Sequence, residues 1–260
     1  MNKKIVDHVG RTITYSYPPK RIISIAPGLT DTLYSLQLEN EIVGRTRYCI
    51  HPKNKVEQAT IVGGTKKINL EKIRKLKPDL ILAEKEENTK EIVELLEKEF
   101  PVFVAEVQTV QDAYRMIHNL GVITDHKPQA EELQTMIQTA FQTLPSIDGK
   151  RFAYVIWKKP YMVVGNHTYI QDLLKTFGLE NAFSSYEGRY PIVSEEDFHK
   201  AKLDYIFLAT EPFPFKEEHK LEFTKQFPDA KTMILDGEML WYGPRMLEAA
   251  AYFKEVFQFE

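Results

Sequence analysis

The feature that most constrains this 260-residue chain is a repeated alternation of short apolar segments with amphipathic helical segments. Apolar residues that follow one another without a polar interruption are typical of strands covered on both faces. Such segments occupy residues 21–26, 42–44, 79–83, 101–105, 152–157, 162–164, 205–209 and 232–235. Strands that alternate with helices predict an α/β protein built on parallel sheets.

Helical segments with apolar residues at spacings of three and four separate these strands. Several begin with N-cap residues, and the pairs Thr109 with Asp112 and Ser194 with Asp197 resemble capping boxes. The predicted helices begin near Thr30, Asn69, Asn88 or Thr89, Thr109, Pro128, Tyr169, Ser194 and Pro244. Ahead of all of them, residues 13–17 alternate in polarity and predict an exposed strand or ribbon.

One interval, residues 109–144, contains helical patterns only, and it divides the chain into two similar halves. We therefore predict two Rossmann-like lobes with central parallel sheets, joined by a long rigid helix. The expected boundaries are an N-terminal α/β lobe at 1–124, a linking backbone helix at 125–146 and a C-terminal α/β lobe at 147–260. Ligands of open α/β sheets bind beyond the carboxyl ends of the strands, so we expect the ligand in a cleft between the lobes.

Charge and composition exclude several other classes of protein. The 34 basic residues nearly balance the 37 acidic ones, so the net charge of −3 gives no field for binding nucleic acid. The hydrophobic fraction of 43% excludes intrinsic disorder, and no apolar run approaches the ~18–20 residues of a membrane helix. A single cysteine, Cys49, excludes an internal disulfide and a zinc site made of clustered cysteines.

The chain begins Met-Asn-Lys-Lys-Ile-Val-Asp, which lacks the apolar core of a secretory signal. The N-terminal residues leave two locations open. The protein is periplasmic or anchored at the cell surface if a leader has been removed, and cytoplasmic if Met1 is the native start.

Known catalytic and nucleotide-binding motifs are missing from the sequence. It contains no GxGxxG after a strand, no GxxxxGK[ST], no GxSxG and no HExxH. Its seven histidines include no pair at i,i+4 or i,i+2 spacing, which disfavours a metal site of several histidines.

Aromatic residues gather where the predicted strands end. Tyr48 follows a strand in the first half, Trp157 and Tyr161 lie near one strand end of the second half, and Trp241-Tyr242 near another. Rings on loops supply large flat surfaces for a bulky ligand, whereas the alternative is that each ring packs into the core. Clusters in both halves favour a binding site.

Three charged residues open predicted helices. Arg245 follows Pro244 at the start of the last helix, where it could address a ligand carboxylate or amide; the alternative is a surface ion pair with Glu248. Glu71 and Glu196 lie in first helical turns, where a carboxylate interacts favourably with the helix dipole.

Several stretches of the chain, in this order and spacing, carry a resemblance to a known family. They are residues 20–27, 42–49, 62–64, 68–73, 77–83, 164–170, 178–183, 191–196 and 243–245. The chain resembles the helical-backbone, class III substrate-binding proteins of ABC importers, and within that family most of all the cobalamin-binding members. Members of the family carry cobalamin, ferric siderophores or haem.

The resemblance implies a non-enzymatic, monomeric receptor that delivers a bulky metal-containing ligand to a membrane permease. It implies no intrinsic cofactor, the ligand being cobalamin or a ferric chelate, and it implies no nucleic-acid partner. One surface glutamate of each lobe would dock on permease arginines, namely Glu71 and Glu196, with Glu195 as a substitute for the latter. The aromatic ligand contacts carry over to Tyr48 and Trp157. The further candidates for the ligand site are Pro27, Tyr161, Trp241, Tyr242 and Arg245.

Some positions depart from the cobalamin-binding pattern. Glu84 and Trp241 stand where those proteins have tryptophan and arginine, and no tryptophan precedes Gly63. We expect Glu84, Glu86 and Glu87 to form a solvated loop tip; the alternative is an acidic rim that suits a cationic or amide-rich ligand.

Two other functions stay open. One is a metal-ion receptor of related fold that binds the ion through its own side chains. The other is a cytoplasmic sensor or enzyme domain built on the same fold.

Overall fold

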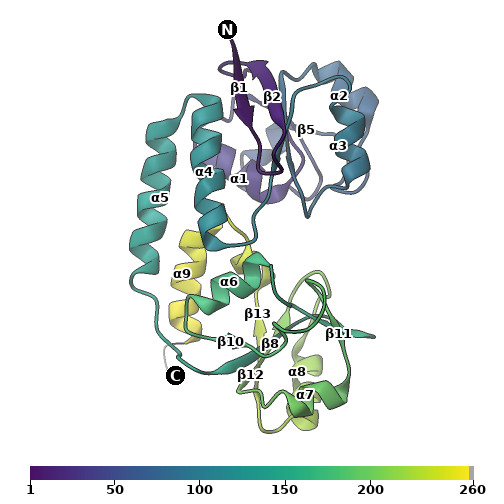
Figure 1. Ribbon diagram of the computed structural model, residues 1–260, viewed down its shortest axis with the longest axis vertical. Helices are drawn as coiled ribbons and strands as arrows, with labels where there is room; N and C mark the ends of the chain where they lie inside the picture. The colour runs from purple at the N-terminus through teal and green to yellow at the C-terminus, as the bar shows by residue number, and fades with distance from the viewer. Residues whose placement is uncertain (258–260) are drawn as a thin grey trace. The chain divides into compact units, whose positions relative to one another are not determined.

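The computed structural model describes residues 1–257. The chain divides into two compact units (Figure 1). Unit 1 comprises Met1–Val107 and Gln111–Gln138, and unit 2 comprises Gln108–Val110 and the chain from Thr139 onward. Each unit contains its own sheet, with parallel strands at its centre and helices packed around it. The predicted α/β class is therefore confirmed.

The sheet of unit 1 has the strand order β5-β4-β3-β6-β7, and all its pairs are parallel. Its strands are β3 (Ile22–Ser24), β4 (Ile42–Arg45), β5 (Thr60–Ile61), β6 (Leu80–Glu84) and β7 (Val102–Ala105). Isoleucine and valine side chains from the central strands form the core, as the continuous apolar runs predicted. The short strand β5 was not predicted, because both of its residues are exposed and form no apolar run.

The α-helices of unit 1 begin near the predicted positions with one exception, and the short 3₁₀ helix η1 was not predicted. They are α1 (Pro27–Ser35), η1 (Val56–Gln58), α2 (Leu70–Leu76), α3 (Lys90–Leu96), α4 (Val110–Thr124) and most of α5 (Lys127–Phe141). Asn69 caps α2 by accepting from the N–H of Lys72, and Thr89 rather than Asn88 caps α3. The expected start of α1 at Thr30 is wrong, because the helix begins at Pro27. Proline suits the first helical position, since its missing N–H would have no helical partner there.

Helices α4 and α5 lie side by side in unit 1 (Figure 1). A Cβ atom added to Gly121 of α4 would lie 2.5 Å from the Cβ of Ala130 in α5, so only glycine permits this approach. The side chain of Gln134 in α5 donates to the carbonyl oxygen of Tyr114 in α4 at 2.8 Å. These two helices fill the strand-free interval that the sequence predicted.

The predicted N-terminal ribbon is one half of a two-stranded antiparallel sheet, made of β1 (Asn2–Val6) and β2 (Thr12–Ser16). In β2 the side chains of Ile13 and Tyr15 are buried and their neighbours are exposed, which is the alternation that predicted it. Strand β1 was not predicted, because its residues are all exposed or half-buried.

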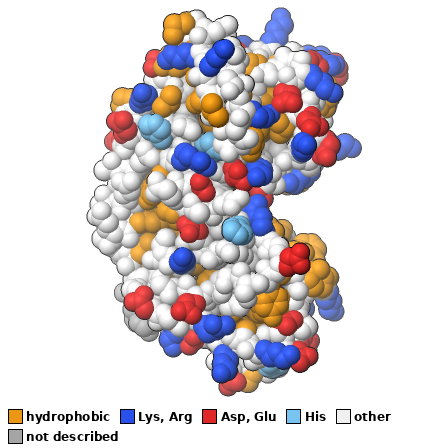
Figure 2. Space-filling view, viewed as in Figure 1, with side chains coloured by type: hydrophobic (Ala, Val, Ile, Leu, Met, Phe, Trp, Pro, Cys, Tyr) orange, Lys and Arg blue, Asp and Glu red, His pale blue; other side chains and the backbone are white. Residues whose placement is uncertain are grey.

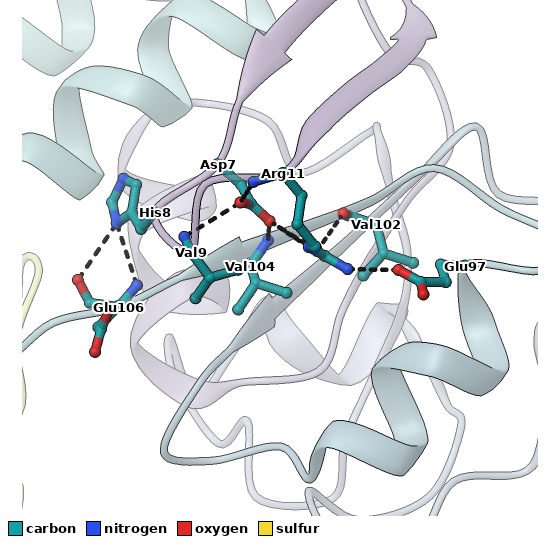
Figure 3. A network of polar contacts seen from close by, with 8 residues as sticks. All are labelled: Asp7, His8, Val9, Arg11, Glu97, Val102, Val104 and Glu106. Atoms are coloured by element: carbon teal, nitrogen blue, oxygen red, sulfur yellow. Dashed lines mark hydrogen bonds and ion pairs between the residues drawn. The ribbon is translucent and has the colours of Figure 1, made fainter.

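The turn that joins β1 to β2 covers the outer edge of β7 (Figure 3). The N–H of His8 donates to the carbonyl oxygen of Val104, and the side chain of Asp7 accepts from the Val104 N–H. The guanidinium of Arg11 donates to the carbonyl oxygen of Val102 at 3.0 Å. The hairpin therefore satisfies backbone groups that an edge strand leaves unpaired.

The sheet of unit 2 has the strand order β11-β9-β8-β12-β13, with β10 paired to β8. Its strands are β8 (Arg151–Trp157), β9 (Tyr161–Val163), β10 (Glu180–Asn181), β11 (Ile192–Val193), β12 (Tyr205–Ala209) and β13 (Lys231–Leu235). Strands β8, β12 and β13 are parallel, whereas β9 runs antiparallel to β8 and β11 antiparallel to β9. The parallel sheet predicted for this half thus has an antiparallel edge.

The helices of unit 2 surround a core rich in phenylalanine. They are α6 (Tyr169–Lys175), α7 (Glu195–Lys200), α8 (Glu217–Gln226), η2 (Gly237–Leu240) and α9 (Arg245–Val256). The predicted capping box is confirmed, because the side chains of Ser194 and Asp197 bond each other's backbone N–H. Helix α8 was not predicted, since Phe223 is its one fully buried residue and the pattern is correspondingly weak.

Candidate ligand-binding site

Most of the predicted ligand-binding residues lie at or beyond the carboxyl ends of strands. In unit 1, Pro27 opens α1 after β3, and Tyr48 lies in the loop after β4. In unit 2, Trp157 is the last residue of β8, and Trp241 and Tyr242 follow β13 and η2. This is the edge of an open α/β sheet at which ligands bind.

Tyr48 keeps 53% of its surface exposed while lying against the backbone of unit 1. A Cβ atom at Gly64 would lie 3.1 Å from the ring atom Cε2 of Tyr48 and 3.7 Å from Nε of Arg47. The absence of a side chain at Gly64 therefore makes room for the ring and the guanidinium together. An exposed aromatic ring beside a cation is a surface on which a large planar ligand can stack.

Arg45 is buried and anchors the loop that carries Tyr48 through hydrogen bonds to backbone carbonyl groups. Its Nε donates to the carbonyl oxygen of Val56 at 2.7 Å, and its Nη1 donates to those of Thr46 and Cys49. Burial raises the pKa of the Cys49 thiol, which stays protonated beside the hydroxyl groups of Thr30 and Thr46. Arg45 could not be recognised from the sequence, because one arginine at the end of a strand carries no pattern.

The expectation of a solvated loop tip is wrong for Glu84, which ends β6 and is 2% exposed. Its Oε2 accepts hydrogen bonds from the backbone N–H groups of Glu86 at 2.7 Å and Glu87 at 2.9 Å. These two N–H groups hold the carboxyl group of Glu84 against the backbone of the loop that follows β6. Burial nevertheless dominates and raises the pKa of Glu84 to about 7, with the charges of Glu86 and Glu87 acting in the same direction.

Asn88 ties the loop after β6 to two other loops of unit 1. Its side chain accepts from the N–H of Glu84 and donates to the carbonyl oxygens of Ile25 and Thr65, at 3.0 Å in both cases. The loops after β3, β5 and β6 are therefore linked at one edge of the sheet.

Both tryptophan side chains of unit 2 contact the loop between β12 and α8. The ring of Trp157, which is 41% exposed, packs edge-on against Phe213 with 5.6 Å between the ring centroids. The indole Nε1 of Trp241 donates to Oε1 of Glu211 at 2.6 Å. Glu211 and Phe213 were missed, although the run Glu-Pro-Phe-Pro-Phe at 211–215 directly after a buried strand is a signal that could have drawn attention to them.

Two of the predicted aromatic residues serve internal packing. Tyr161 packs edge-on against Phe198 and Phe223, with ring centroids 5.6 and 5.4 Å apart, and burial raises the pKa of its hydroxyl. The ring of Tyr242 packs against that of Tyr169 at 5.8 Å.

Arg245 forms an ion pair with Glu248, which lies one turn further along α9. This is the alternative that the sequence analysis gave for Arg245. Its side chain is 12% exposed, so the guanidinium presents little surface to solvent.

The two predicted docking glutamates are exposed and lie in first helical turns. Glu71 of α2 is 72% exposed and pairs with Arg74 at 2.5 Å, and Glu196 of α7 is 74% exposed and pairs with Lys200 at 2.6 Å. Exposed ion pairs of this kind contribute less than ~1 kcal/mol, so either carboxylate can exchange its partner for an external cation.

Metal-binding clusters and membrane helices are both absent from the described chain. Among residues 1–257, no three His, Cys, Asp or Glu side chains lie together in a way that could hold a metal ion. No helix within that range is both long and apolar enough to cross a membrane. On the face shown in Figure 2, basic and acidic side chains are interspersed, as the nearly balanced charge leads one to expect.

Comparison with known protein families gives a match that covers most of the chain. A family model described as periplasmic binding protein matches residues 22–230. The chain belongs to the periplasmic binding protein family. Members of this family are binding proteins rather than enzymes. The predicted resemblance to substrate-binding proteins and the predicted non-enzymatic role are therefore both confirmed.

The chain is similar to vitamin B12-binding proteins. The protein of that name from Pectobacterium atrosepticum is 27% identical over 249 residues, covering 89% of this chain and 86% of its own. The one from Vibrio vulnificus strain YJ016 is 29% identical over 200 residues, covering 74% and 72%.

Solved structures of family members share the fold at low sequence identity. A protein of Staphylococcus epidermidis described as a possible iron-binding, periplasmic solute-binding protein gives a TM-score of 0.77 at 24% identity, covering 92% of this chain and 99% of its own. The periplasmic vitamin B12 binding protein BtuF of Vibrio cholerae gives 0.73 at 22%, covering 94% and 99%. The periplasmic haem binding protein HutB of Vibrio cholerae gives 0.77 at 18%, covering 91% and 98%.

Proposed function

We propose that this protein is the substrate-binding component of an ABC importer and that its ligand is a bulky metal-containing compound, namely a corrinoid, haem or a ferric chelate. The observation that carries the proposal is the pair of exposed rings at the carboxyl edges of the two sheets, Tyr48 in unit 1 and Trp157 in unit 2. The names of the relatives support the same ligand class, since they include vitamin B12-binding and haem-binding proteins.

Each of these two sheet edges suits a large flat ligand, because its ring is exposed while neighbouring residues hold it in place. Arg45 holds the loop of Tyr48, and Phe213 packs against Trp157. Rings that are already fixed lose little conformational freedom on binding, so more of the stacking energy appears as affinity. Stacking of one aromatic pair is worth about 0.5–1.5 kcal/mol beyond the apolar area that it buries.

Titration of the purified protein with cobalamin, cobinamide, haemin and a ferric catecholate tests the ligand class. We expect at least one of them to quench tryptophan fluorescence with a Kd of about 1 μM or below, the range of a specific receptor. The variant Tyr48→Leu should raise that Kd about tenfold, whereas the control Tyr186→Leu, which removes another exposed tyrosine, should leave it unchanged. If none of the four compounds quenches Trp157 or Trp241, the proposed ligand class is wrong.

The proposal includes a membrane permease as partner and a location outside the cytoplasmic membrane, where a substrate-binding protein meets its permease. Glu71 and Glu196 would dock on basic residues of that permease, with Glu195 as the substitute in α7. A metal-ion receptor is the competing function, and metal analysis after exhaustive dialysis separates the two. Zinc or manganese retained at a stoichiometric level would favour the ion receptor.

A further inference from the structure

One hydrogen bond ties together the carboxyl ends of two neighbouring strands in unit 2. Glu211 follows β12, and Trp241 directly follows η2, which comes after β13. Strands β12 and β13 are parallel and in register up to the pair Ala209–Leu235. The bond from the Trp241 indole to Glu211 therefore crosses the edge at which ligands of such sheets bind, and its length of 2.6 Å fits a charge-assisted bond.

The backbone around this bond is shaped to accept the Glu211 side chain. A Cβ atom added to Gly237 would lie 2.4 Å from Cγ of Glu211, so any other residue at 237 would displace that side chain. The N–H of Gly237 donates to Oγ1 of Thr210 at 2.8 Å, and Asp236 accepts from the N–H of Glu238 at 3.0 Å. These contacts fix η2 and, with it, the segment that carries Trp241.

The environment of Glu211 disfavours a carboxylate. Burial raises the pKa of Glu211, the charges of Glu238 and Asp236 raise it further, and the bond from Trp241 opposes them. From β8, the buried Tyr154 also interacts with this carboxyl group. Packing alone does not call for an acid here, and the indole N–H of Trp241 gains an acceptor from it.

The two indoles of unit 2 are held differently. Trp157 is held by ring packing against Phe213, whereas Trp241 is held at its N–H edge by a hydrogen bond. A bond at the edge fixes the plane of the half-buried ring. A flat ligand that stacks on an indole needs the plane to be set before it arrives, because ordering the ring during binding would lower the affinity.

We propose that Glu211 is a positioning residue for ligand binding, which sets the plane of the Trp241 indole so that the ring forms one wall of the site in unit 2. This inference rests on the proposed function, since it assumes that a ligand stacks at the carboxyl edge of the sheet. Glu211 acts through Trp241 and need not touch the ligand.

The experiment uses the fact that the chain has two tryptophans, so that Trp157→Phe leaves Trp241 as the single indole. In this background we compare Glu211→Ala, Glu211→Gln and the control Glu217→Gln, which removes the same charge from an exposed position of α8. The readouts in this background are acrylamide quenching and emission of Trp241 across pH. The Kd for cobinamide and for haemin is measured for the same variants with Trp157 in place, because Trp157 belongs to the proposed binding surface.

We expect Glu211→Ala to raise the acrylamide quenching constant about twofold and the Kd about tenfold, because the Trp241 ring must then be ordered during binding. Glu211→Gln retains an acceptor oxygen and should restore most of the affinity. The emission of Trp241 should titrate with pH when Glu211 is present and lose that titration in Glu211→Gln. Gly237→Ala should behave like Glu211→Ala, because it displaces the same side chain.

Unchanged quenching, emission and Kd in Glu211→Ala would overturn the inference, as would an equal effect of Glu217→Gln. If neither compound binds the wild-type protein, the proposed function fails for these ligands, while the quenching and pH measurements still decide whether Glu211 positions the ring. If Glu211→Ala does not fold, Glu211→Gln and Gly237→Ala provide the same readouts.

Discussion

Asp7 and Arg11 form an ion pair in the turn of the N-terminal hairpin, with 2.7 Å between Oδ2 and Nη2. The Asp7 side chain is fully buried and also accepts from the N–H groups of Val9, Arg11 and Val104. Figure 3 shows the aspartate at the centre of this network. Because these bonds connect the hairpin to β7, the pair differs from the exposed ion pairs found elsewhere on the molecule.

Replacing Asp7 should destabilise unit 1 strongly. Asp7→Ala removes the acceptor of the buried Val104 N–H and of the N–H groups of Val9 and Arg11, and it leaves the Arg11 guanidinium with only Val102 and Glu97 as acceptors, so we expect a loss of about 3 kcal/mol in the free energy of unfolding. Urea denaturation followed by circular dichroism measures it. The control Glu97→Gln removes the exposed partner of Arg11 and should cost less than ~1 kcal/mol. Equal losses in the free energy of unfolding for the two variants would show that Asp7 contributes no more to stability than the exposed Glu97.

Glu84 should make the protein less stable as the pH rises. Its pKa is raised by burial from 4.5 to about 7, so between these values the folded state holds a proton that the unfolded chain releases. The free energy of unfolding therefore falls as the pH rises through this range, and at 1.36 kcal/mol per pKa unit the loss above pH 7 is about 3 kcal/mol.

The variant Glu84→Gln has no such proton to lose. Its stability relative to wild type should therefore improve between about pH 5 and about pH 8 by nearly that amount. Burial lowers the pKa of His8, which gives a pH dependence of the opposite sign, but this contribution cancels when variant and wild type are compared at each pH. The control Glu94→Gln, at an exposed position of α3, should show no such change. A parallel pH profile for Glu84→Gln and wild type would contradict the assignment.

Gly121 should tolerate no side chain. In Gly121→Ala the new Cβ would lie 2.5 Å from that of Ala130, and overpacking of this kind costs about 1–3 kcal/mol. Thermal unfolding of the single variant and of Gly121→Ala combined with Ala130→Gly tests the cause. The second substitution removes the opposing Cβ, so it should recover part of the loss even though glycine lowers helix propensity by about 1 kcal/mol. Strictly additive losses would place the strain elsewhere.

Charge reversal at the proposed docking residues should impair transport without affecting ligand binding. Glu71→Lys and Glu196→Lys place a cation where the permease is expected to present one, so we predict that each lowers uptake about fivefold or more. The controls Glu94→Lys and Glu217→Lys reverse exposed charges on other helices. Uptake by reconstituted vesicles and Kd by fluorescence are the two measurements.

Several results would contradict that docking role. A raised Kd in either variant would point to the ligand site instead, and an equal loss of uptake in the controls would indicate a general charge effect. If Glu195→Lys lowers uptake and Glu196→Lys does not, the docking carboxylate of unit 2 is Glu195.

The sequence predicted the elements whose residues pack locally and missed those that depend on distant partners. Buried strands such as β6 and β12 have continuous apolar runs, so they could be recognised. The two-residue strands β5, β10 and β11 have no such run, and they exist because a neighbouring strand pairs with them. Helix α1 begins earlier than the expected start at Thr30, because Pro27 itself serves as a first helical residue.

In the candidate site, too, the features set by nearby residues could be predicted and those set by distant partners could not. The end of a strand fixes where its next residues lie, so Tyr48 and Trp157 could be placed at the sheet edges. The partner of each ring, however, comes from far along the chain: Phe213 packs against Trp157, and Glu211 binds the indole of Trp241. The burial of Glu84 likewise depends on how the following backbone turns back, which no side-chain pattern encodes.

The hairpin turn on β7 has a consequence for how the molecule behaves at high concentration. The outward backbone groups of Val102, Val104 and Glu106 are occupied by Arg11, Asp7 and His8, and the opposite edge strand, β5, offers only two residues. A sheet that presents no long row of open amide and carbonyl groups cannot add strands from other molecules. The hairpin thereby removes a route to fibrillar self-association in a receptor that must stay dispersed to shuttle its cargo.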